Sequence, residues 1–372
     1  MKILHLHRSC NPVFGGPIEY TTQLGLKWLE MGHKVHWISL DPPGAQWVKK
    51  FPLPITALGQ WRHRYGLSPV VIEWLWEHAA EYDAVMVHGL WQFQGLAAFH
   101  ALKRGGPPYF VMVHGMLDPW FKNTYPLKHL KKSLYWKLVE SHVLRRARGV
   151  IFTCEEERLL AQNTFQPYQA REFVVVSGTQ KPAGNKEKWE AAFYKKFPDL
   201  RGKRLLVFLS RLHLKKGCDM LLKAFAKYGG PLHLVIAGPD EEPEHVVELR
   251  LLAAGLPVTF TGMLRGDLKW GALSAAEAFI LPSHQENFGM VVAESLAMGT
   301  PVLISNKVNI WREIEADAAG LVENDDLQGT ERLLQRWHAT DQEAMREAAR
   351  RCFATRFDIQ KTAENMLVVL QS

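Results

Sequence analysis

Two glutamates, Glu286 and Glu294, lie eight residues apart on either side of the expected start of a helix. Asn287 and Gly289 mark the turn before that helix. A helix N-terminus has unpaired N–H groups and a partial positive charge, so the loop that ends at Met290 can hold a phosphate. Two carboxylates would repel the phosphate. We therefore expect them to accept hydrogen bonds from the hydroxyls of a ribose and of a sugar.

Two cations of the same half of the chain can reach one diphosphate. Arg211 follows the apolar run 204–210, and Lys216 with Gly217 precedes a helix that starts near Asp219. A cation just after a strand and another just before a helix N-terminus are placed to meet the same anion. An isolated arginine or lysine in a loop is usually a surface charge, so this assignment depends on the surrounding string.

Apolar runs alternate with helical patterns along the chain, which predicts parallel sheets covered by helices. The polar segment 177–202 separates two such series and predicts a linker. The strands expected in the first series are 2–7, 33–40, one near Ile55, 84–87, 109–113, 150–153 and 173–176, and those in the second are 204–210, 233–237, 258–263, 278–281, 302–304 and 320–324.

Ligands of such sheets gather at the carboxyl ends of the strands. Gly15 and Gly16 follow the first strand and precede a helix that we expect to begin at Pro17, so they are candidates for an anion site. His88 and His114 follow two later strands and are candidates for the same edge.

The stretch 286–294, with Asn-Phe-Gly between its glutamates, and the Arg-x4-Lys-Gly-x-Asp string within 210–219 resemble a known pattern. It is the donor-site signature of retaining glycosyltransferases with the GT-B fold, above all family 4. The segment 113–120 resembles a motif of members that build bacterial surface polysaccharides. The resemblance covers nearly the whole chain.

The resemblance implies an α/β protein with two Rossmann-like, doubly wound parallel-sheet domains that face a central cleft. Residues 1–176 would form the acceptor domain and residues 177–355 the nucleotide-sugar donor domain. A C-terminal helix at about 356–372 would pack back on the first domain. The implied activity is hexosyl transfer from a UDP- or GDP-type sugar to a saccharide or lipid-linked saccharide, in exopolysaccharide, O-antigen or related glycan assembly.

The same resemblance assigns roles to single residues. Arg211 and Lys216 would stabilise the leaving diphosphate, Glu286 and His114 would bond the transferred sugar, and Glu294 would bond the ribose. No cofactor is implied. The sequence has no Asp-x-Asp motif to hold a metal ion, so we expect metal-independent transfer with retention of configuration. The other positions expected at the donor are Gly15, Gly16, Met263, Asn287, Phe288, Gly289 and Met290.

The composition is that of a globular protein, with 372 residues, 47% hydrophobic and 22% charged. No apolar run approaches the length of a membrane span, and the four cysteines form no Cys-x-x-Cys pair. These features predict a cytoplasmic protein. The resemblance also implies that the protein acts at the inner face of the cytoplasmic membrane.

Residues 121–150 carry eight lysines or arginines against one glutamate, a net of +7 that equals the net charge of the whole chain. A nucleic-acid binder more often spreads its basic residues over a face with interleaved aromatic residues, so we expect no nucleic-acid partner. A basic helix suits an anionic membrane surface, which it would contact through Lys128, Lys131, Lys132, Arg145 and Arg146, or it is simply solvated. Leucines recur there at helical spacing, and we expect this stripe to pack in the core: Leu127, Leu130, Leu134 and Leu138.

Two other classes of function remain open at this point. One is a related GT-B enzyme, a sugar-nucleotide epimerase or a phosphorylase. The Arg-x4-Lys-Gly string favours a transferase, and we find no context for a pyridoxal-binding lysine. The other is a non-enzymatic anion-binding protein, which would leave Arg211, Lys216, Glu286 and Glu294 unexplained.

Overall fold

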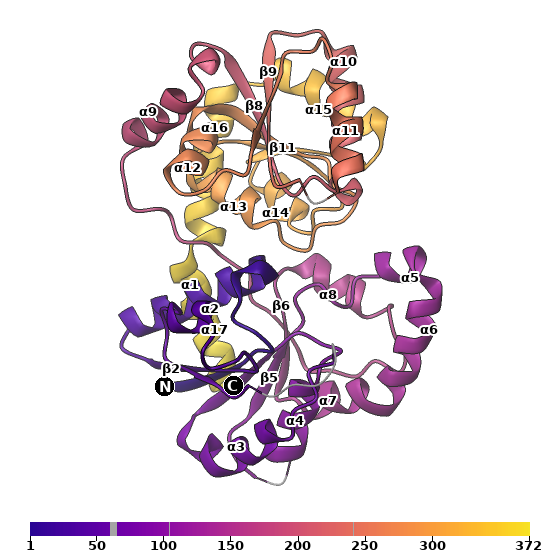
Figure 1. The fold of residues 1–372 in the computed structure, drawn as a ribbon. Helices are drawn as coiled ribbons and strands as arrows, with labels where there is room; N and C mark the ends of the chain where they lie inside the picture. The colour runs from indigo at the N-terminus through magenta and orange to yellow at the C-terminus, as the bar shows by residue number, and fades with distance from the viewer. Residues whose placement is uncertain (60–64, 104, 241) are drawn as a thin grey trace. The chain divides into compact units, whose positions relative to one another are not determined.

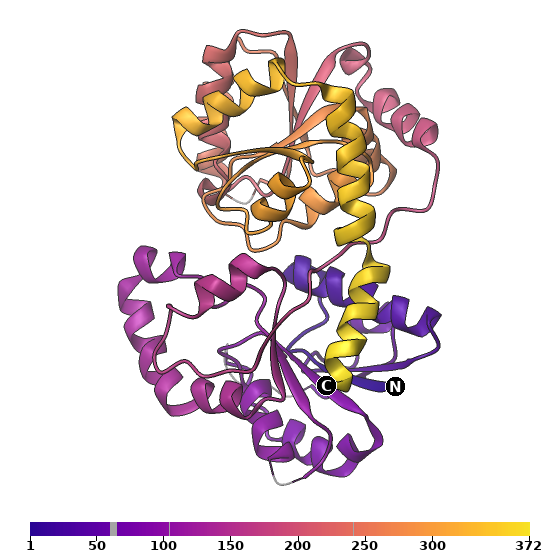
Figure 2. The same ribbon diagram turned by 180° about the vertical axis from the view of Figure 1, so that it is seen from behind.

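The computed structural model describes residues 1–59, 65–103, 105–240 and 242–372. The chain forms two compact units, one of Met1–Gly178 together with Ile359–Ser372, the other of Thr179–Asp358. Each unit contains one parallel sheet with helices packed against it (Figure 1). Both chain ends lie in the first unit (Figure 2).

The sheet of the first unit has seven strands in the order β3-β2-β1-β4-β5-β6-β7, all paired in parallel. The central strands β4, β5 and β6 are buried along their whole length, as is typical of a parallel sheet covered on its faces. The strand bounds are β1 Lys2–Leu6, β2 Lys34–Ser39, β3 Ile55–Ala57, β4 Ala84–His88, β5 Tyr109–Met112, β6 Gly149–Phe152 and β7 Glu172–Val174.

The helices of the first unit include one contributed by the end of the chain. Helix α17 lies beside α1, and the indole N–H of Trp28 donates to the carbonyl of Ala363 at 3.1 Å. Gly32, with φ of 83°, follows α1 and lets the chain turn into β2. The bounds are α1 Gly16–Glu30, α2 Gln46–Lys49, α3 Val70–His78, α4 Phe93–Leu102, α5 Trp120–Thr124, α6 Pro126–Tyr135, α7 Ser141–Arg146, α8 Glu155–Ala161 and α17 Ile359–Gln371.

The second unit has a six-stranded parallel sheet in the order β10-β9-β8-β11-β12-β13. Its strands are β8 Arg204–Leu209, β9 Leu232–Ala237, β10 Val258–Gly262, β11 Ala276–Leu281, β12 Val302–Ser305 and β13 Gly320–Glu323. Asn185, Asp326 and Asp341 accept backbone N–H groups as N-caps of three helices. The helices are α9 Lys186–Lys196, α10 Cys218–Tyr228, α11 Pro243–Leu252, α12 Asp267–Ala275, α13 Met290–Ala297, α14 Trp311–Ala316, α15 Leu327–His338 and α16 Gln342–Cys352.

The two sheets confirm the expected fold class, a pair of doubly wound α/β domains. In each sheet the strand order reverses beside the first strand of the unit, so β1 lies between β2 and β4, and β8 between β9 and β11. Ligands of open α/β sheets bind at this reversal, outside the carboxyl ends of the strands. The loops after β1, β4, β8 and β11 are therefore where a site is expected.

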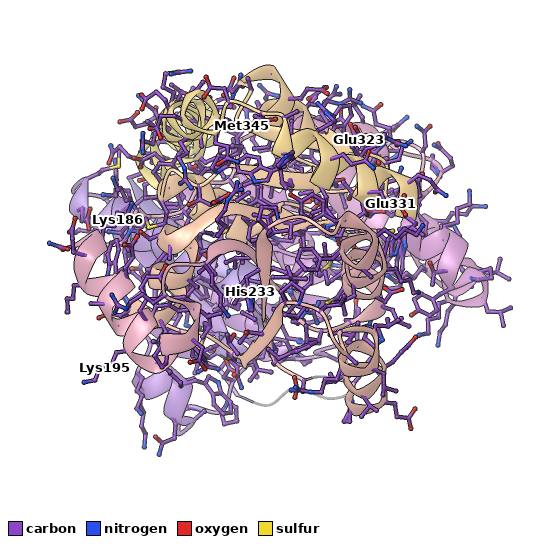
Figure 3. All side chains as sticks on the ribbon, turned by 90° about the horizontal axis from the view of Figure 1, so that it is seen from above. Lys186, Lys195, His233, Glu323, Glu331 and Met345 are labelled. Atoms are coloured by element: carbon purple, nitrogen blue, oxygen red, sulfur yellow. The ribbon has the colours of Figure 1, made fainter. Side chains whose placement is uncertain are left out.

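Several surface charges of the second unit are paired. Glu323 meets Arg332 and Arg336, and Glu331 meets Lys227. Figure 3 shows Lys186 and Lys195 of α9 projecting outward. No helix in the described part of the chain is both long enough and apolar enough to cross a lipid bilayer.

Candidate active site

The loop between β11 and α13 is held by backbone hydrogen bonds from two neighbouring loops. The N–H of Glu286 donates to the carbonyl of Lys307 at 2.9 Å, and the N–H of Asn309 donates back to Glu286 at 3.0 Å. On the other side, the N–H of His284 donates to the carbonyl of Lys215 at 2.9 Å. These bonds fix the position of Glu286 before any ligand binds.

Gly289 begins the helix with a left-handed backbone, φ 78°, as its N-cap, so the loop turns sharply into α13. The first N–H groups of a helix have no partner within it, and they follow this turn directly, at Met290. The helix has eight residues. Gly299, with φ of 72°, ends it, and the N–H of Thr300 turns back to the carbonyl of Ser295 at 3.0 Å.

Lys216 and Glu286 form an ion pair that joins the loops after β8 and β11. Lys216 is 5% exposed and comes from a 3₁₀ turn, Leu214–Lys216, which ends at Gly217. Gly217 has φ of 67°, and a Cβ there would lie 2.3 Å from the carbonyl oxygen of Pro282. Glycine is therefore needed for the close approach that brings lysine and glutamate together.

Glu294, 5% exposed, accepts from the ammonium of Lys269 at 2.6 Å. Lys269 lies on α12 and also sits over the ring of Trp270, 4.2 Å from its centroid. The sequence analysis missed Lys269, because nothing in its neighbourhood distinguishes it from an ordinary surface lysine. A carboxylate can accept hydrogen bonds from more than one donor, and hydroxyl groups are among the donors that suit it.

The other residues expected at the donor differ in their exposure and in the loop that carries them. Arg211 lies on the exposed turn directly after β8. Phe288 is buried and packs edge-on against Phe357, so it is a core residue that supports the loop. Asn287 is half-buried. Met263 is exposed and follows β10, the edge strand of the sheet. Because β10 lies two strands away from β8, Met263 is separated from the ion pair of Lys216 and Glu286.

In the first unit, Gly15 and Gly16 lie where the chain enters α1. Gly15 is the N-cap with φ of 73°, and a Cβ there would meet open space. The helix starts at Gly16, one residue earlier than expected, because Pro17 fits the first turn without needing to be its first residue. The loop that precedes it comes from β1, at the reversal of the strand order.

His114 follows β5 with φ of 52°, a conformation that few residues with a side chain adopt. Its Nε2 lies 3.0 Å from Nδ1 of His88. Burial lowers the pKa of His114 to about 4, so the ring is neutral at pH 7. A neutral imidazole can donate one hydrogen bond to a hydroxyl and accept one.

A buried carboxylate that the sequence analysis missed holds the His114 loop. Glu157, 3% exposed, accepts the N–H of Gly115 and both the N–H and the hydroxyl of Thr153 at 2.6 Å. It thereby ties the loop after β5 to the loop after β6. Its signal in the sequence is weak, because it stands among three successive glutamates at the start of α8.

Both halves of the chain match known protein families. Residues 15–178 match the family described as "Glycosyl transferase 4-like domain", and residues 191–351 match "Glycosyl transferases group 1". Each half of the chain is thus similar to a glycosyltransferase domain, and the two matches together span most of the sequence.

Relatives of these glycosyltransferase domains align over part of their length. A GDP-mannose-dependent alpha-(1-6)-phosphatidylinositol dimannoside mannosyltransferase from Mycobacterium tuberculosis is 36% identical over 124 residues, 32% of this chain and 32% of that protein. A sulfoquinovosyl transferase from Arabidopsis thaliana is 29% identical over 119 residues, 32% of this chain and 22% of that protein. The matched stretch thus covers about a third or less of these relatives.

Solved structures match the fold over the whole chain. Sucrose-phosphate synthase from Thermosynechococcus elongatus aligns with a TM-score of 0.76 at 19% identity, covering 100% of this chain and 98% of that one. The Anabaena protein HepE in complex with UDP aligns with a TM-score of 0.78 at 18% identity, covering both chains fully. At this identity the likeness shows the GT-B fold.

The basic segment of the first glycosyltransferase domain contradicts one prediction. Leu127, Leu130, Leu134 and Leu138 are 63–83% exposed, so the leucine stripe does not pack in the core. The opposite face of α6 is the one that packs. His129 stacks on Phe165, and Lys132 lies over the ring of Trp91 at 4.5 Å. Periodicity identified residues that share a face of the helix, but the aromatic residues beneath it decided which face is covered.

Proposed function

We propose that the protein is a retaining glycosyltransferase that moves a sugar from a UDP- or GDP-type donor to a saccharide or lipid-linked saccharide acceptor. The observation that carries the proposal is the buried Lys216, held against Glu286 where the loops after β8 and β11 meet. A buried ammonium beside a helix start suits a diphosphate. The mycobacterial relative, by its name, uses GDP-mannose, and the Anabaena structure contains UDP.

The proposed chemistry follows from the charges of these loops. As the bond from the sugar's anomeric carbon to the diphosphate breaks, Arg211, Lys216 and the first amides of α13 stabilise the negative charge on the leaving group. The acceptor hydroxyl forms the new bond on the same face, and its proton passes to a leaving phosphate oxygen. Glu286 would bond a hydroxyl of the transferred sugar.

Glu294 and His114 have further proposed roles. Glu294 would accept the ribose hydroxyls while Lys269 holds its carboxylate in place. His114 would hydrogen-bond the transferred sugar. In the protein without donor, Glu286 pairs with Lys216. When the donor binds, the ammonium of Lys216 would contact both this carboxylate and a phosphate.

We expect full activity in excess EDTA. The sequence has no Asp-x-Asp motif, and lysine, arginine and helix amides can supply the charge that a divalent cation supplies elsewhere. The measurement is donor turnover before and after chelation. Loss of activity that magnesium or manganese restores would show that a metal ion takes part.

Calorimetric titration with UDP and GDP, followed by a screen of nucleotide sugars with a hydrolysis readout, tests the proposal. Binding of one nucleotide together with transfer or slow hydrolysis is expected. Binding without any turnover would favour a non-enzymatic binder. Interconversion of donor sugars would point to an epimerase, and phosphate-dependent cleavage of a glycan to a phosphorylase.

The acceptor is proposed to carry an anionic group, as lipid-linked saccharides of surface-glycan assembly do. A cavity beside α6 begins in the loop that follows His114. Its cationic side chains favour a phosphate, and its aromatic walls favour an apolar or sugar face. It is lined by Met116, Asp118, Tyr125, Lys128, His129, Lys132, Thr164 and Phe165.

We further propose that α6 docks on an anionic membrane leaflet. The exposed leucine stripe lies beside exposed lysines, including Lys131 and Lys137. An apolar stripe with lysines at its borders suits the boundary between headgroups and acyl chains. Each lysine or arginine near an anionic leaflet contributes about 1 kcal/mol. Lys132 is excluded from this role because it lies over Trp91.

Vesicle sedimentation tests the membrane proposal. We expect salt-sensitive binding to anionic liposomes that falls about 30-fold in Leu130→Ser/Leu134→Ser and in Lys131→Glu/Lys137→Glu, since each pair contributes roughly 2 kcal/mol. Matched controls are two exposed apolar residues at the same spacing on α11, in Val247→Ser/Leu251→Ser, and two exposed lysines of α9, in Lys186→Glu/Lys195→Glu. Equal binding to neutral vesicles, or equal effects of test and control pairs, would remove the idea.

A further inference from the structure

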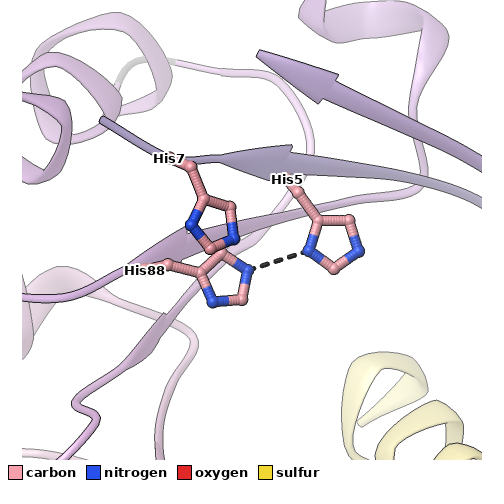
Figure 4. Close-up of side chains that lie close together, drawn as sticks. All are labelled: His5, His7 and His88. Atoms are coloured by element: carbon pink, nitrogen blue, oxygen red, sulfur yellow. Dashed lines mark hydrogen bonds between the residues drawn. The ribbon is translucent and has the colours of Figure 1, made fainter. Parts of the chain in front are cut away.

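Three histidines of the first unit form a chain of hydrogen bonds that ends at His114. Nδ1 of His5 lies 2.8 Å from Nε2 of His88, as the dashed line in Figure 4 shows. Nδ1 of His88 lies 3.0 Å from Nε2 of His114. His5 and His88 are buried, at 0% and 4% exposure. They come from β1 and β4, the two strands at the reversal of the sheet order.

All three rings are neutral at pH 7. Burial lowers the pKa of His5 to about 3, and burial together with the neighbouring histidines holds the pKa of His88 well below its usual value. A neutral imidazole has one N–H donor and one acceptor nitrogen. His88 must therefore donate at one end of the chain and accept at the other, so only two directions are available.

The far end of the chain selects between these directions. Nε2 of His5, at the far end of the three histidines, is buried and has no hydrogen-bond partner among the residues that the structure describes. If the bonds ran from His114 to His5, this nitrogen would carry a buried N–H without an acceptor, which proteins rarely leave. If they run from His5 to His114, it carries only an unused lone pair. The second direction is the less costly one.

We propose that His5 and His88 are positioning residues that fix the tautomer of His114, with its proton on Nδ1. In this direction Nδ1–H of His88 donates to Nε2 of His114, so the remaining N–H of His114 can only be on Nδ1. That N–H is then a fixed donor toward a hydroxyl of the bound sugar. The last step rests on the proposed function, whereas the tautomer itself does not.

The geometry does not favour a metal ion at this cluster, although nitrogen atoms of His5, His7 and His88 lie within 4.8 Å of one another. The facing nitrogens of His5 and His88 already bond each other. His7 stacks on His88, with ring centroids 3.9 Å apart and planes 12° apart. Figure 4 shows the two rings beside each other. Lone pairs of stacked rings run side by side and do not converge on one point, as ligands of a metal ion must.

Long-range ¹H–¹⁵N spectra of histidine-labelled protein read the tautomer of each ring in the free enzyme. His114 is identified by the signal that its alanine variant lacks, and we expect its proton on Nδ1. His88→Phe keeps a flat ring but removes both bonds. We expect that in this variant the proton of His114 is no longer confined to Nδ1, and that kcat for donor turnover falls about tenfold. His88→Asn places an amide N–H near the position of Nδ1 and should restore both.

His7→Phe is the matched control. His7 is buried and stacks on His88, as the other histidines of the cluster do, but it takes no part in the hydrogen bonds that join His5, His88 and His114. It should leave the His114 tautomer unchanged. A proton on Nε2 of His114 in the wild-type protein overturns the proposal, and this spectrum needs no variant to fold. Stoichiometric zinc whose chelation changes the His5 and His88 signals would overturn it too, as would His88→Phe with wild-type turnover. Absence of turnover with every donor counts against the proposed function alone.

Discussion

Replacing Lys216 with alanine is expected to lower donor turnover by a factor on the order of 100 or more, while the protein remains folded. The ammonium is buried and faces the loop that precedes α13, so it would act on the diphosphate with little screening by water. Its removal also leaves the carboxylate of Glu286 without this cation, and that negative charge then repels the phosphates. The measurement is kcat with the preferred donor, with circular dichroism to check the fold.

The matched control is Lys223→Ala, which removes an exposed lysine of α10 that pairs with Asp219 on the same helix. It changes the net charge equally and should leave turnover near the wild-type value. Arg211→Ala should lower turnover by a similar factor to Lys216→Ala. Near wild-type turnover of Lys216→Ala would mean that the diphosphate lies elsewhere.

Gly217→Ala is expected to reduce the free energy of unfolding of the second unit by about 3 kcal/mol, through two separate costs. A left-handed backbone costs a residue with a side chain roughly 1–2 kcal/mol. In addition, the new Cβ would lie 2.3 Å from the carbonyl oxygen of Pro282, so the turn after β8 must move away from the end of β11. That movement separates Lys216 from Glu286, so turnover should fall as well.

Gly229→Ala separates the cost of a left-handed backbone from the cost of the contact with Pro282. Gly229 ends the same helix, α10, with nearly the same backbone, φ 59°, but a Cβ there meets nothing within 4 Å. It should cost only the backbone term, about 1–2 kcal/mol, and leave turnover unchanged. Urea midpoints of the two variants provide the comparison. Equal midpoints would show that the contact with Pro282 relaxes without cost.

Sequence patterns predicted the sheets well because burial on both faces forces continuous apolar runs. Every expected strand is present, and β11 is only two residues longer than its run 278–281 indicated. Helix ends were less certain. The length of α13 depended on where Gly299 and Thr300 close the last turn, which a pattern of apolar residues does not reveal.

The site was predictable in its residue types and not in its pairings. The strings around Arg211 and Glu286 marked the loops, but the contact between Lys216 and Glu286 requires two loops separated by 70 residues to meet. The histidine chain is similar. His5 lies in β1 and His7 follows its last residue, so the two rings fall on one side as alternation implies. His88 joins them only because β4 pairs with β1 in parallel.

The position of α17 has a consequence for the order in which the protein folds during synthesis. The second unit is inserted between Gly178 and Ile359 of the first, and α17 must return to cover α1 and receive the Trp28 indole. At about 5–20 residues per second, translation of the 179–358 segment takes roughly 10–40 s. During that interval the first unit lacks its last helix, and its uncovered surface on α1 is open to chaperones and proteases while the second unit folds.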